Sequence, residues 1–328
     1  MYYRLFAILI YLGLGSTVCK SQVSNVKPQI NHTFTFVELN CENLFDCRHD
    51  EGKQDQEFTP EGRRHWTRTK YWRKLKHIAQ EILSCADRLP ELVALVEVEN
   101  DSVMRDLTHR SLLRRAGYQY LMTESPDVRG LDVALLYQPL CFLPLCYEHL
   151  AIATMKNQRP TRDILYVKGL VMTGDTLHLY IVHAPSRYGG ELETRPYRLQ
   201  VARTLIDHLS TIGQARAIVA GDFNDYADDA SLLLLERAGL QNVSRSAKGL
   251  KGHARGTYRF RGDWHSLDHI FVSPLLAPCF TRSYINDAPF LLEEEQVYGG
   301  YKPFRTFNGF RYQGGFSDHL PLVLELGL

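Results

Sequence analysis

The sequence lacks several features that would assign it to a function class at once. It has almost no net charge, with 38 Lys and Arg against 37 Asp and Glu, so no global field draws it to polyanions, although a bound cation lets such a protein act on phosphates. It has no Cys-x-x-Cys pair of the kind found in zinc sites. No apolar run approaches the roughly 20 residues that span a bilayer. These absences leave a globular protein, and the substrate stays open.

The first residues are typical of an export signal. Arg4 precedes an apolar stretch over residues 5–14, which is followed by the small residues 15–17. We therefore expect residues 1–21 to be a signal peptide and the protein to be exported, either periplasmic or secreted. Cys19 lies near a bacterial lipoprotein cleavage pattern, but the bulky Val18 before it disfavours a lipid anchor. Disulfides are permitted in an exported protein.

The rest of the chain alternates strand-like and helix-like segments without a Pro/Gly/Ser linker or an internal repeat. Apolar residues recur at helical spacing over residues 71–86 and 199–209. This alternation predicts one α/β domain over residues 33–328, and we expect a monomer. We interpret Thr281–Phe316 as a surface excursion that shapes the substrate entrance. The predicted strands cover residues 34–39, 92–96, 132–137, 164–171, 177–182, 217–220, 267–272 and 322–326.

Most of these strands end on a polar residue that a core strand does not need. Ligands of α/β folds bind where strands end, so we expect these side chains to converge on one site. They are Asn40, Glu97, His183, Asp222, Asn224, Asp268, Asp318 and His319.

Two motif readings can be excluded within these segments. The segment Gly221–Asp225 is not a calcium loop of the EF-hand type, because Ala227 and Leu233 stand where that loop needs Gly and Glu. Ser186 is not a serine nucleophile of the elbow type, because the flanking glycines are missing. We interpret Ser186 as a residue that supports its loop.

Six segments taken together resemble the endonuclease/exonuclease/phosphatase superfamily, in the order in which that superfamily has them. The resemblance runs from Phe36 to the end of the chain. Its segments are Val37–Phe45, Val96–Asn100, Val182–Ser186, Gly221–Asn224, Leu267–Ile270 and Ser317–Pro321.

The resemblance implies a four-layered αββα sandwich, in which two mixed β-sheets pack face to face, and a divalent cation in the site. Glu97 would be the principal metal ligand, with Asn40 and Asp318 nearby. Carboxylate and amide oxygens suit Mg²⁺, with Mn²⁺ as the alternative. Glu99 is the rival of Glu97, and we expect it to be a supporting or solvated residue.

The same resemblance implies hydrolysis of a phosphoester by attack of water on phosphorus. Asn224, His183 and His319 fit the role of donors that offset charge growing on the phosphate. Two assignments of the base stay open: Asp222, or His319 paired with Asp268. We favour Asp222 as the group that orients or deprotonates the water, with Asp268 holding His319 against the phosphate.

Three further residues are candidates for substrate binding. They are Arg129, Ser186 and Trp264. A run of basic and aromatic residues over 63–76 would suit a nucleic acid backbone, but we favour its reading as the solvated face of the first helix.

The leading hypothesis is an exported, Mg²⁺-dependent phosphodiesterase or endonuclease. The expected partner is a phosphoester substrate, with nucleic acid favoured over phospholipid. The alternatives are a phospholipid or inositol phosphate hydrolase of the same fold and a non-catalytic binding module.

Overall fold

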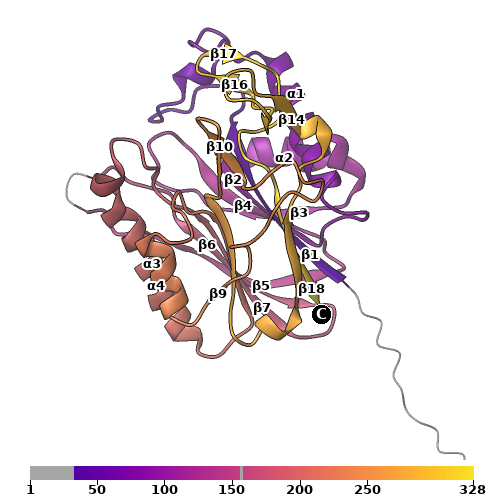
Figure 1. The fold of residues 1–328 in the computed structure, drawn as a ribbon, viewed down its shortest axis with the longest axis vertical. Helices are drawn as coiled ribbons and strands as arrows, with labels where there is room; N and C mark the ends of the chain where they lie inside the picture. The colour runs from indigo at the N-terminus through magenta and orange to yellow at the C-terminus, as the bar shows by residue number, and fades with distance from the viewer. Residues whose placement is uncertain (1–32, 156–157) are drawn as a thin grey trace, which may run out of the picture. The chain divides into compact units, whose positions relative to one another are not determined.

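The computed structural model describes residues 33–155 and 158–328 (Figure 1). The expected signal segment, residues 1–21, lies outside this range. Within the described residues, the architecture is a sandwich of two mixed six-stranded sheets with helices on the outer faces. The predicted four-layered fold is therefore confirmed.

The first sheet has the strand order β13-β18-β1-β2-β4-β3. Only β1 and β2 run parallel, and every other neighbouring pair is antiparallel. Its strands are β1 (Thr33–Leu44), β2 (Leu92–Val98), β3 (Gln119–Met122), β4 (Asp132–Tyr137), β13 (Phe280–Ile285) and β18 (Leu322–Gly327).

The second sheet has the order β5-β6-β7-β8-β12-β9, and here β7 and β8 are the parallel pair. The remaining pairs are antiparallel. Its strands are β5 (Phe142–Leu150), β6 (Ile164–Val171), β7 (Thr176–His183), β8 (Ala217–Asp222), β9 (Gln241–Asn242) and β12 (Asp268–Val272).

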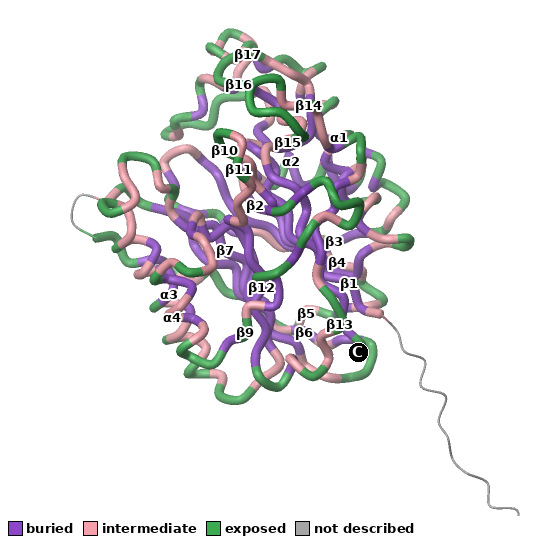
Figure 2. The backbone as a smooth tube through the Cα atoms, in the orientation of Figure 1, coloured by how far each residue is buried: buried purple, intermediate pink, exposed green. Residues whose placement is uncertain are grey.

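Two pairs of helices cover the outer faces of the sheets (Figure 1). Helices α1 (Arg68–Leu83) and α2 (Asp101–His109) pack apolar side chains against β1 and β2 of the first sheet. Helices α3 (Glu191–Ile212) and α4 (Ala230–Arg237) do the same for β7 and β8 of the second sheet. Figure 2 shows the buried backbone concentrated between these helix layers.

Short elements connect or extend the layers. Three hairpins stand outside the sheets: β10 (Tyr258–Phe260) with β11 (Asp263–His265), β14 (Leu292–Glu294) with β15 (Tyr301–Pro303), and β16 (Phe307–Asn308) with β17 (Arg311–Tyr312). The 3₁₀ turns are η1 (Gln56–Phe58), η2 (Leu112–Arg115), η3 (Ala277–Cys279) and η4 (Pro289–Leu291).

Side-chain alternation divides each central strand between two cores. On β1, Phe34 and Phe36 belong to the core between the sheets, whereas Val37 and Leu39 pack under the helices. Successive side chains of a strand point to opposite faces, so residues two apart share a face. This parity decides which polar residues at the strand ends point into the space between the sheets.

The structure corrects three expectations from the sequence. The strands β3 and β5 were not predicted, and Thr281–Phe316 is not wholly a surface excursion, because β13 pairs with β18 at the edge of the first sheet. Lys74 is buried rather than solvated, and it donates to Thr306 Oγ1 at 2.7 Å and to the carbonyl of Phe316.

Two observations bear on the environment of the protein. Every cysteine of the described residues is free. Among those same residues, no helix has both the length and the apolarity of a membrane span.

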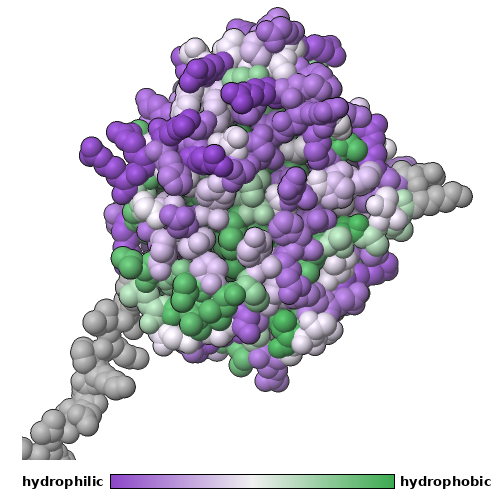
Figure 3. Space-filling view, turned by 180° about the vertical axis from the view of Figure 1, so that it is seen from behind, coloured by the Kyte–Doolittle hydropathy of each residue, from purple (hydrophilic) through white to green (hydrophobic). Residues whose placement is uncertain are grey.

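Apolar side chains are also exposed on the surface of the described residues. Figure 3 shows apolar side chains gathered low on the rear face. Exposed large apolar residues include Leu143, Leu145 and Tyr147 of the edge strand β5.

Candidate active site

The inward-facing side of the two sheets ends in polar residues. Asn40 shares its strand face with Phe34 and Phe36 of β1, and Asp222 shares its face with Ala220 of β8. By the same parity His183 continues the inward face of β7, and Asp268 that of β12. The predicted convergence of polar strand ends thus follows from side-chain alternation, which puts all four residues on the inner face. Polar groups at this edge of the apolar interior must find hydrogen-bond partners or water.

Glu97 reaches this space by a different device. Val96 faces the inner core, so strict alternation would point Glu97 toward the helix layer. Its backbone instead has φ of 63°, and the pairing of β2 with β4 shifts at this point. A left-handed backbone is unfavourable for a residue with a Cβ and is concentrated at functional sites. The side chain then lies beside His183, with Nε2 and Oε1 separated by 3.6 Å.

Gly221 and Asn224 shape the turn that presents Asp222. Gly221 has φ of 147°, and a Cβ there would lie 1.9 Å from the carbonyl oxygen of Val182, so only glycine fits. Asn224 has φ of 52°, and it donates from its backbone N to Asp222 Oδ1 at 2.8 Å and from Nδ2 to the Ala184 carbonyl at 3.1 Å. The turn holds Asp222 and Asn224 side by side.

Hydrogen bonds join the two sheets across the site. Asn40 Nδ2 of the first sheet donates to Asp222 Oδ2 of the second at 3.0 Å. His319 Nδ1, from the segment before β18, lies 2.8 Å from Asp268 Oδ2. Asp222, Asp268 and His319 each offer a ligand atom within 4.8 Å of the others. The site therefore needs both sheets in contact.

The two histidines of the site differ in charge. Burial lowers the pKa of His183 well below its ordinary value, and the positive charges of Arg162 and Arg129 lower it further. Burial also acts to lower the pKa of His319, but the charge of Asp268 and the hydrogen bond to it outweigh burial and raise that pKa well above its ordinary value. Near neutral pH, His183 is neutral and His319 is cationic.

The carboxylates of the site are the kind of ligand that a hard divalent cation takes. Burial, together with the charge of Asp268, raises the pKa of Asp222 to about 7. Asp268 Oδ1 is buried and has no hydrogen-bond donor within the described residues. Glu97 and Asn40 add hard oxygen atoms at the same end of the sheets, which is the donor type that Mg²⁺ and Mn²⁺ prefer.

Arg162 is a functional candidate that the sequence reasoning missed. It is 7% exposed, donates from Nε to His183 Nδ1 at 3.2 Å, and pairs with Asp127 at 3.2 Å. It precedes β6, and it was not among the polar residues singled out at the ends of the predicted strands. Because β6 runs antiparallel to β7, with Leu165 opposite Ile181, the start of β6 lies beside the end of β7. A polar residue before an apolar strand was the available signal.

Glu38 is a second residue that the sequence reasoning missed. It lies two residues before Asn40 on the inward face of β1, is fully buried, and has no hydrogen-bond partner in the described structure for either carboxylate oxygen. Burial, then the charges of Asp268 and Asp222, raise its pKa well above the ordinary value. Glu38 is therefore a neutral acid beneath the site.

The remaining predicted residues lie at different distances from this centre. Asp318 is ion-paired, with its Oδ2 2.7 Å from Arg305 Nη2. Arg129 lies close enough for its charge to lower the pKa of His183. Ser186 accepts a hydrogen bond from the Tyr188 backbone at 3.4 Å, within its own loop. Trp264 packs against the inner core, with the Arg259 guanidinium 5.7 Å from its ring.

Glu99 was expected to be either a supporting residue or a solvated one, and the structure shows that it is buried. It is 5% exposed, and its Oε2 accepts a hydrogen bond from the Asp46 backbone at 2.6 Å.

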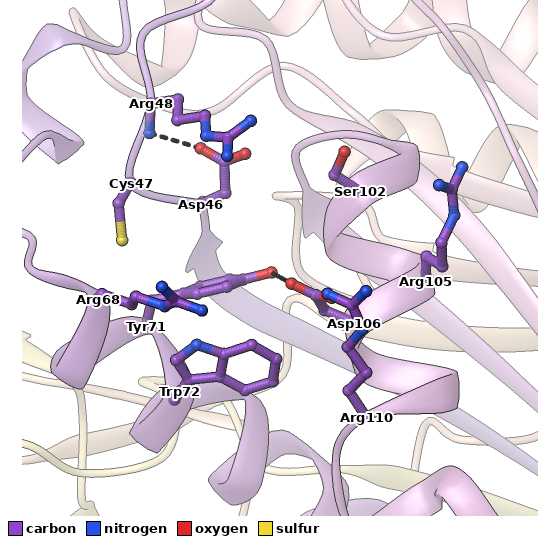
Figure 4. A pocket seen from close by; sticks show the side chains of 10 residues that line it. All are labelled: Asp46, Cys47, Arg48, Arg68, Tyr71, Trp72, Ser102, Arg105, Asp106 and Arg110. Carbon is purple, nitrogen blue, oxygen red and sulfur yellow. Dashed lines mark hydrogen bonds and ion pairs between the residues drawn. The ribbon is translucent and has the colours of Figure 1, made fainter.

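The basic run at the start of α1 lines a separate pocket of about 340 Å³ (Figure 4). Arg68 and Trp72 face the loop 46–48 and α2 across it, and Tyr71 donates to Asp106 Oδ2 at 3.0 Å. Two further arginines of its wall are ion-paired, Arg105 with Asp101 and Arg110 with Asp106. Much of the basic charge of this pocket is thus offset within the chain.

Comparisons with known proteins agree with this geometry. A family profile described as "Endonuclease/Exonuclease/phosphatase family" matches residues 35–327. No curated protein matches the chain.

Three solved structures illustrate the similarity in fold. A Bacteroides thetaiotaomicron protein of that family has 16% identity and a TM-score of 0.61, and the match covers 90% of this chain and 97% of the other. The mannosyl-6-phosphatase Bt3783 of the same organism has 17% identity and a TM-score of 0.61, with 90% and 100% covered. D. rerio TDP2, complexed with single strand DNA product, has 16% identity and a TM-score of 0.57, with 90% and 99% covered.

Proposed function

Because the chain belongs to the endonuclease/exonuclease/phosphatase family, whose members hydrolyse phosphoester bonds, we propose that it is a metal-dependent phosphodiesterase acting on nucleic acid. The observation that carries the proposal is the hydrogen-bonded chain across the sheets, in which Asn40 meets Asp222 and Asp268 meets His319. It places an oriented carboxylate and a cationic donor within one small space.

The roles of the side chains follow from their charges. His319, held cationic by Asp268, donates to a phosphate oxygen and offsets the charge that grows there in the transition state. His183 is neutral and sits beside the cationic Arg162, so the two present donors to a second oxygen. Asn224 adds a neutral amide to the same set.

Asp222 is the residue we assign to the attacking water. Its Oδ2 accepts from Asn40 and its Oδ1 from the Asn224 backbone, so its orientation is fixed from both sides. A pKa of about 7 matches the requirement that a general base be poised near the operating pH. Glu97, Asn40 and Asp318 would hold Mg²⁺ or Mn²⁺, which as a Lewis acid would stabilise the leaving oxygen.

Aromatic and basic groups beside the site favour nucleic acid as substrate. Tyr258 lies against His319, with ring centroids 5.0 Å apart, and Arg129 and Arg162 lie near His183. Aromatic faces stack on bases, and arginine contacts the backbone. A structural neighbour complexed with single strand DNA product supports the same choice.

In line with the pattern of residues 1–21, we also propose that the protein is exported.

One observation favours a second candidate, a phospholipid hydrolase. The β14–β15 hairpin carries the exposed apolar residues Val297 and Tyr298, 78% and 57% accessible. Exposed apolar side chains of this kind insert into a lipid surface. Glu293 and Glu294 of the same hairpin oppose contact with anionic lipid.

A substrate panel tests both candidates. The purified protein is incubated with plasmid DNA, RNA, sphingomyelin, inositol phosphates or mannose 6-phosphate, with Mg²⁺, with Mn²⁺ or with EDTA. We expect metal-dependent cleavage of nucleic acid and no turnover in EDTA. Release from sphingomyelin alone would establish the second candidate, and no release from any substrate would contradict catalysis.

The panel needs a variant that separates the enzyme from contaminants. Glu97→Gln removes the principal ligand charge with little change of volume, and its loss of turnover is expected. Full activity of that variant would show that the cleavage comes from another protein or another site.

A further inference from the structure

A second group of carboxylates lies outside the site already described. Asp50 and Asp55 belong to the loop after β1, and Glu99 directly follows β2. Each of the three offers an oxygen within 4.8 Å of the others. Asp50 and Glu99 also line a groove of about 780 Å³ between the two sheets' outer loops.

One oxygen of this cluster is buried without a partner. Glu99 is 5% exposed; its Oε2 accepts from the Asp46 backbone, but Oε1 has no donor among the described residues. A buried carboxylate oxygen without a donor loses its hydration and gains nothing in return.

The chain supplies little positive charge to this cluster. Within the described residues its one ion pair is that of Asp55 with His49. Lys53, the nearest lysine along the chain, donates instead to the carbonyls of Ser125 and Asp127 at 3.1 and 3.0 Å. Asn100 Nδ2 approaches Asp50 Oδ2 only at 3.5 Å. Close carboxylates without a cation repel one another.

We propose that Asp50, Asp55 and Glu99 bind a divalent cation of the Ca²⁺ type, separate from the catalytic site. The ligands are hard oxygen atoms, without a cysteine, which excludes soft metals. Three carboxylates from two separate segments suit the flexible coordination of Ca²⁺ better than that of Mg²⁺, which takes one or two carboxylates and keeps its waters. The exposed Asp50 leaves the remaining positions open to water.

The proposed ion would fasten the loop after β1 to the end of β2. Asp46 N already donates to Glu99, and Glu99 N donates to the Leu44 carbonyl at 3.2 Å. Near the end of β1, Asn43 N donates to Glu97 Oε2 at 2.8 Å. The ion therefore stabilises the segment that orients the principal ligand of the catalytic site.

Calcium binding to a variant that lacks the catalytic ligand tests this proposal. Glu97→Gln protein, freed of metal, is titrated with Ca²⁺ by calorimetry, and its thermal unfolding is followed with and without Ca²⁺. We expect one binding site with a dissociation constant of roughly 10⁻⁷ to 10⁻³ M, the range of protein calcium sites. The unfolding midpoint should rise with Ca²⁺, because the ion binds only the folded state.

Two further substitutions in the same background locate the ion. Asp50→Asn removes an exposed ligand charge. Loss of a residue that only supports a metal ligand already lowers metal affinity by about tenfold or more, so we expect Asp50→Asn to lower the Ca²⁺ affinity by at least about tenfold. Glu51→Gln removes the same charge from the neighbouring exposed residue, outside the cluster, and should keep the affinity of the parent. Glu99→Gln keeps an acceptor for Asp46 N and should bind weakly, like Asp50→Asn.

Two results would overturn the proposal. One is the absence of Ca²⁺ binding in Glu97→Gln, and the other is equal binding in the Asp50→Asn and Glu51→Gln variants. Either would leave the proposed hydrolysis untouched, because the measurement is calcium binding and not turnover.

Discussion

His183 and His319 stand at the ends of the two sheets with similar burial, 4% and 6% exposed, and yet carry different charge. Burial lowers the pKa of both rings, and at His183 it is the largest cause, with the guanidinium of Arg162 lowering that pKa further. At His319 the carboxylate of Asp268 raises the pKa and keeps the ring cationic. Similar burial therefore leaves one ring neutral and the other cationic, and the neighbouring carboxylate makes the difference.

The division of charge has a chemical use. A phosphate in the site would meet one cationic imidazole and one neutral imidazole backed by a cation. Because the His183 ring is neutral, it places no second positive charge beside Glu97, where a metal ion would bind. The four predictions that follow break or sharpen this contrast, from the largest expected effect to the smallest.

Removing the cationic ring should have the largest effect. We expect His319→Ala to lower kcat by about 10³, in the middle of the range for loss of a positioned acid or base. Steady-state rates on the best substrate of the panel measure it. The exposed His253→Ala serves as the control and should keep the parental rate; equal loss in both variants would contradict a specific role.

Breaking the pair that charges His319 should have a smaller effect with a distinct pH signature. Asp268→Asn keeps the shape but removes the charge that raises the pKa of His319, so that pKa falls. We expect kcat near neutral pH to drop by about 10², with the basic limb of the pH–rate profile moved to lower pH. A lower rate with an unmoved basic limb would mean that Asp268 acts on something other than this proton.

Removing the cation beside the neutral ring should raise the pKa of His183, while burial continues to lower it. In Arg162→Gln the pKa of His183 rises toward its ordinary value, and we expect about a tenfold loss in kcat/KM, the equivalent of one pKa unit of interaction. NMR titration of the imidazole protons in EDTA follows the pKa directly. Arg162→Lys keeps the charge and should keep the low pKa of His183. An unchanged pKa in Arg162→Gln would contradict the inference that Arg162 lowers it.

The smallest effect is on stability, and its sign differs between the rings. His319 binds its proton more tightly when folded, so its contribution is complete below about pH 6.5 and is lost as pH rises through its raised folded pKa. His183 binds its proton less tightly when folded, so stability is lost as pH falls below about 6.5 toward its lowered folded pKa.

Urea unfolding in EDTA across this pH range measures both. The differences between wild type and His319→Gln, and between wild type and His183→Gln, should slope in opposite directions, with changes of the order of 1 kcal/mol, since one pKa unit is worth about 1.4 kcal/mol. Parallel slopes would show that the two rings titrate alike.

The sequence predicted the part of the site that depends on strand ends. Asn40, His183 and Asp222 each follow an apolar run and Asp268 begins one, and alternation carries each of them to the inner face. The central strands and the helices α1 and α3 were predicted from their periodicities, whereas the packing of two sheets face to face was implied by the family resemblance.

What the sequence did not predict depends on contacts between distant segments. Arg162 precedes its strand and reaches the site only because β6 runs against β7. The edge strand β5 carries exposed residues and lacks a clear alternation. Lys74 lies in a basic run but is buried because Thr306 and Phe316 supply its acceptors. Partners so far apart leave no local pattern in the chain.

The pairing of β1 with β18 places the first and last strands of the domain side by side, with Phe34 opposite Leu326. His319 is synthesised after Asn40 and every other residue of the site, so a growing chain holds the rest of the site before it holds the cationic imidazole. Proteins are made from the N-terminus at about 5–20 residues per second, and the nascent chain lacks His319 throughout that time. We expect a chain that ends before His319 to lack the activity proposed for this site.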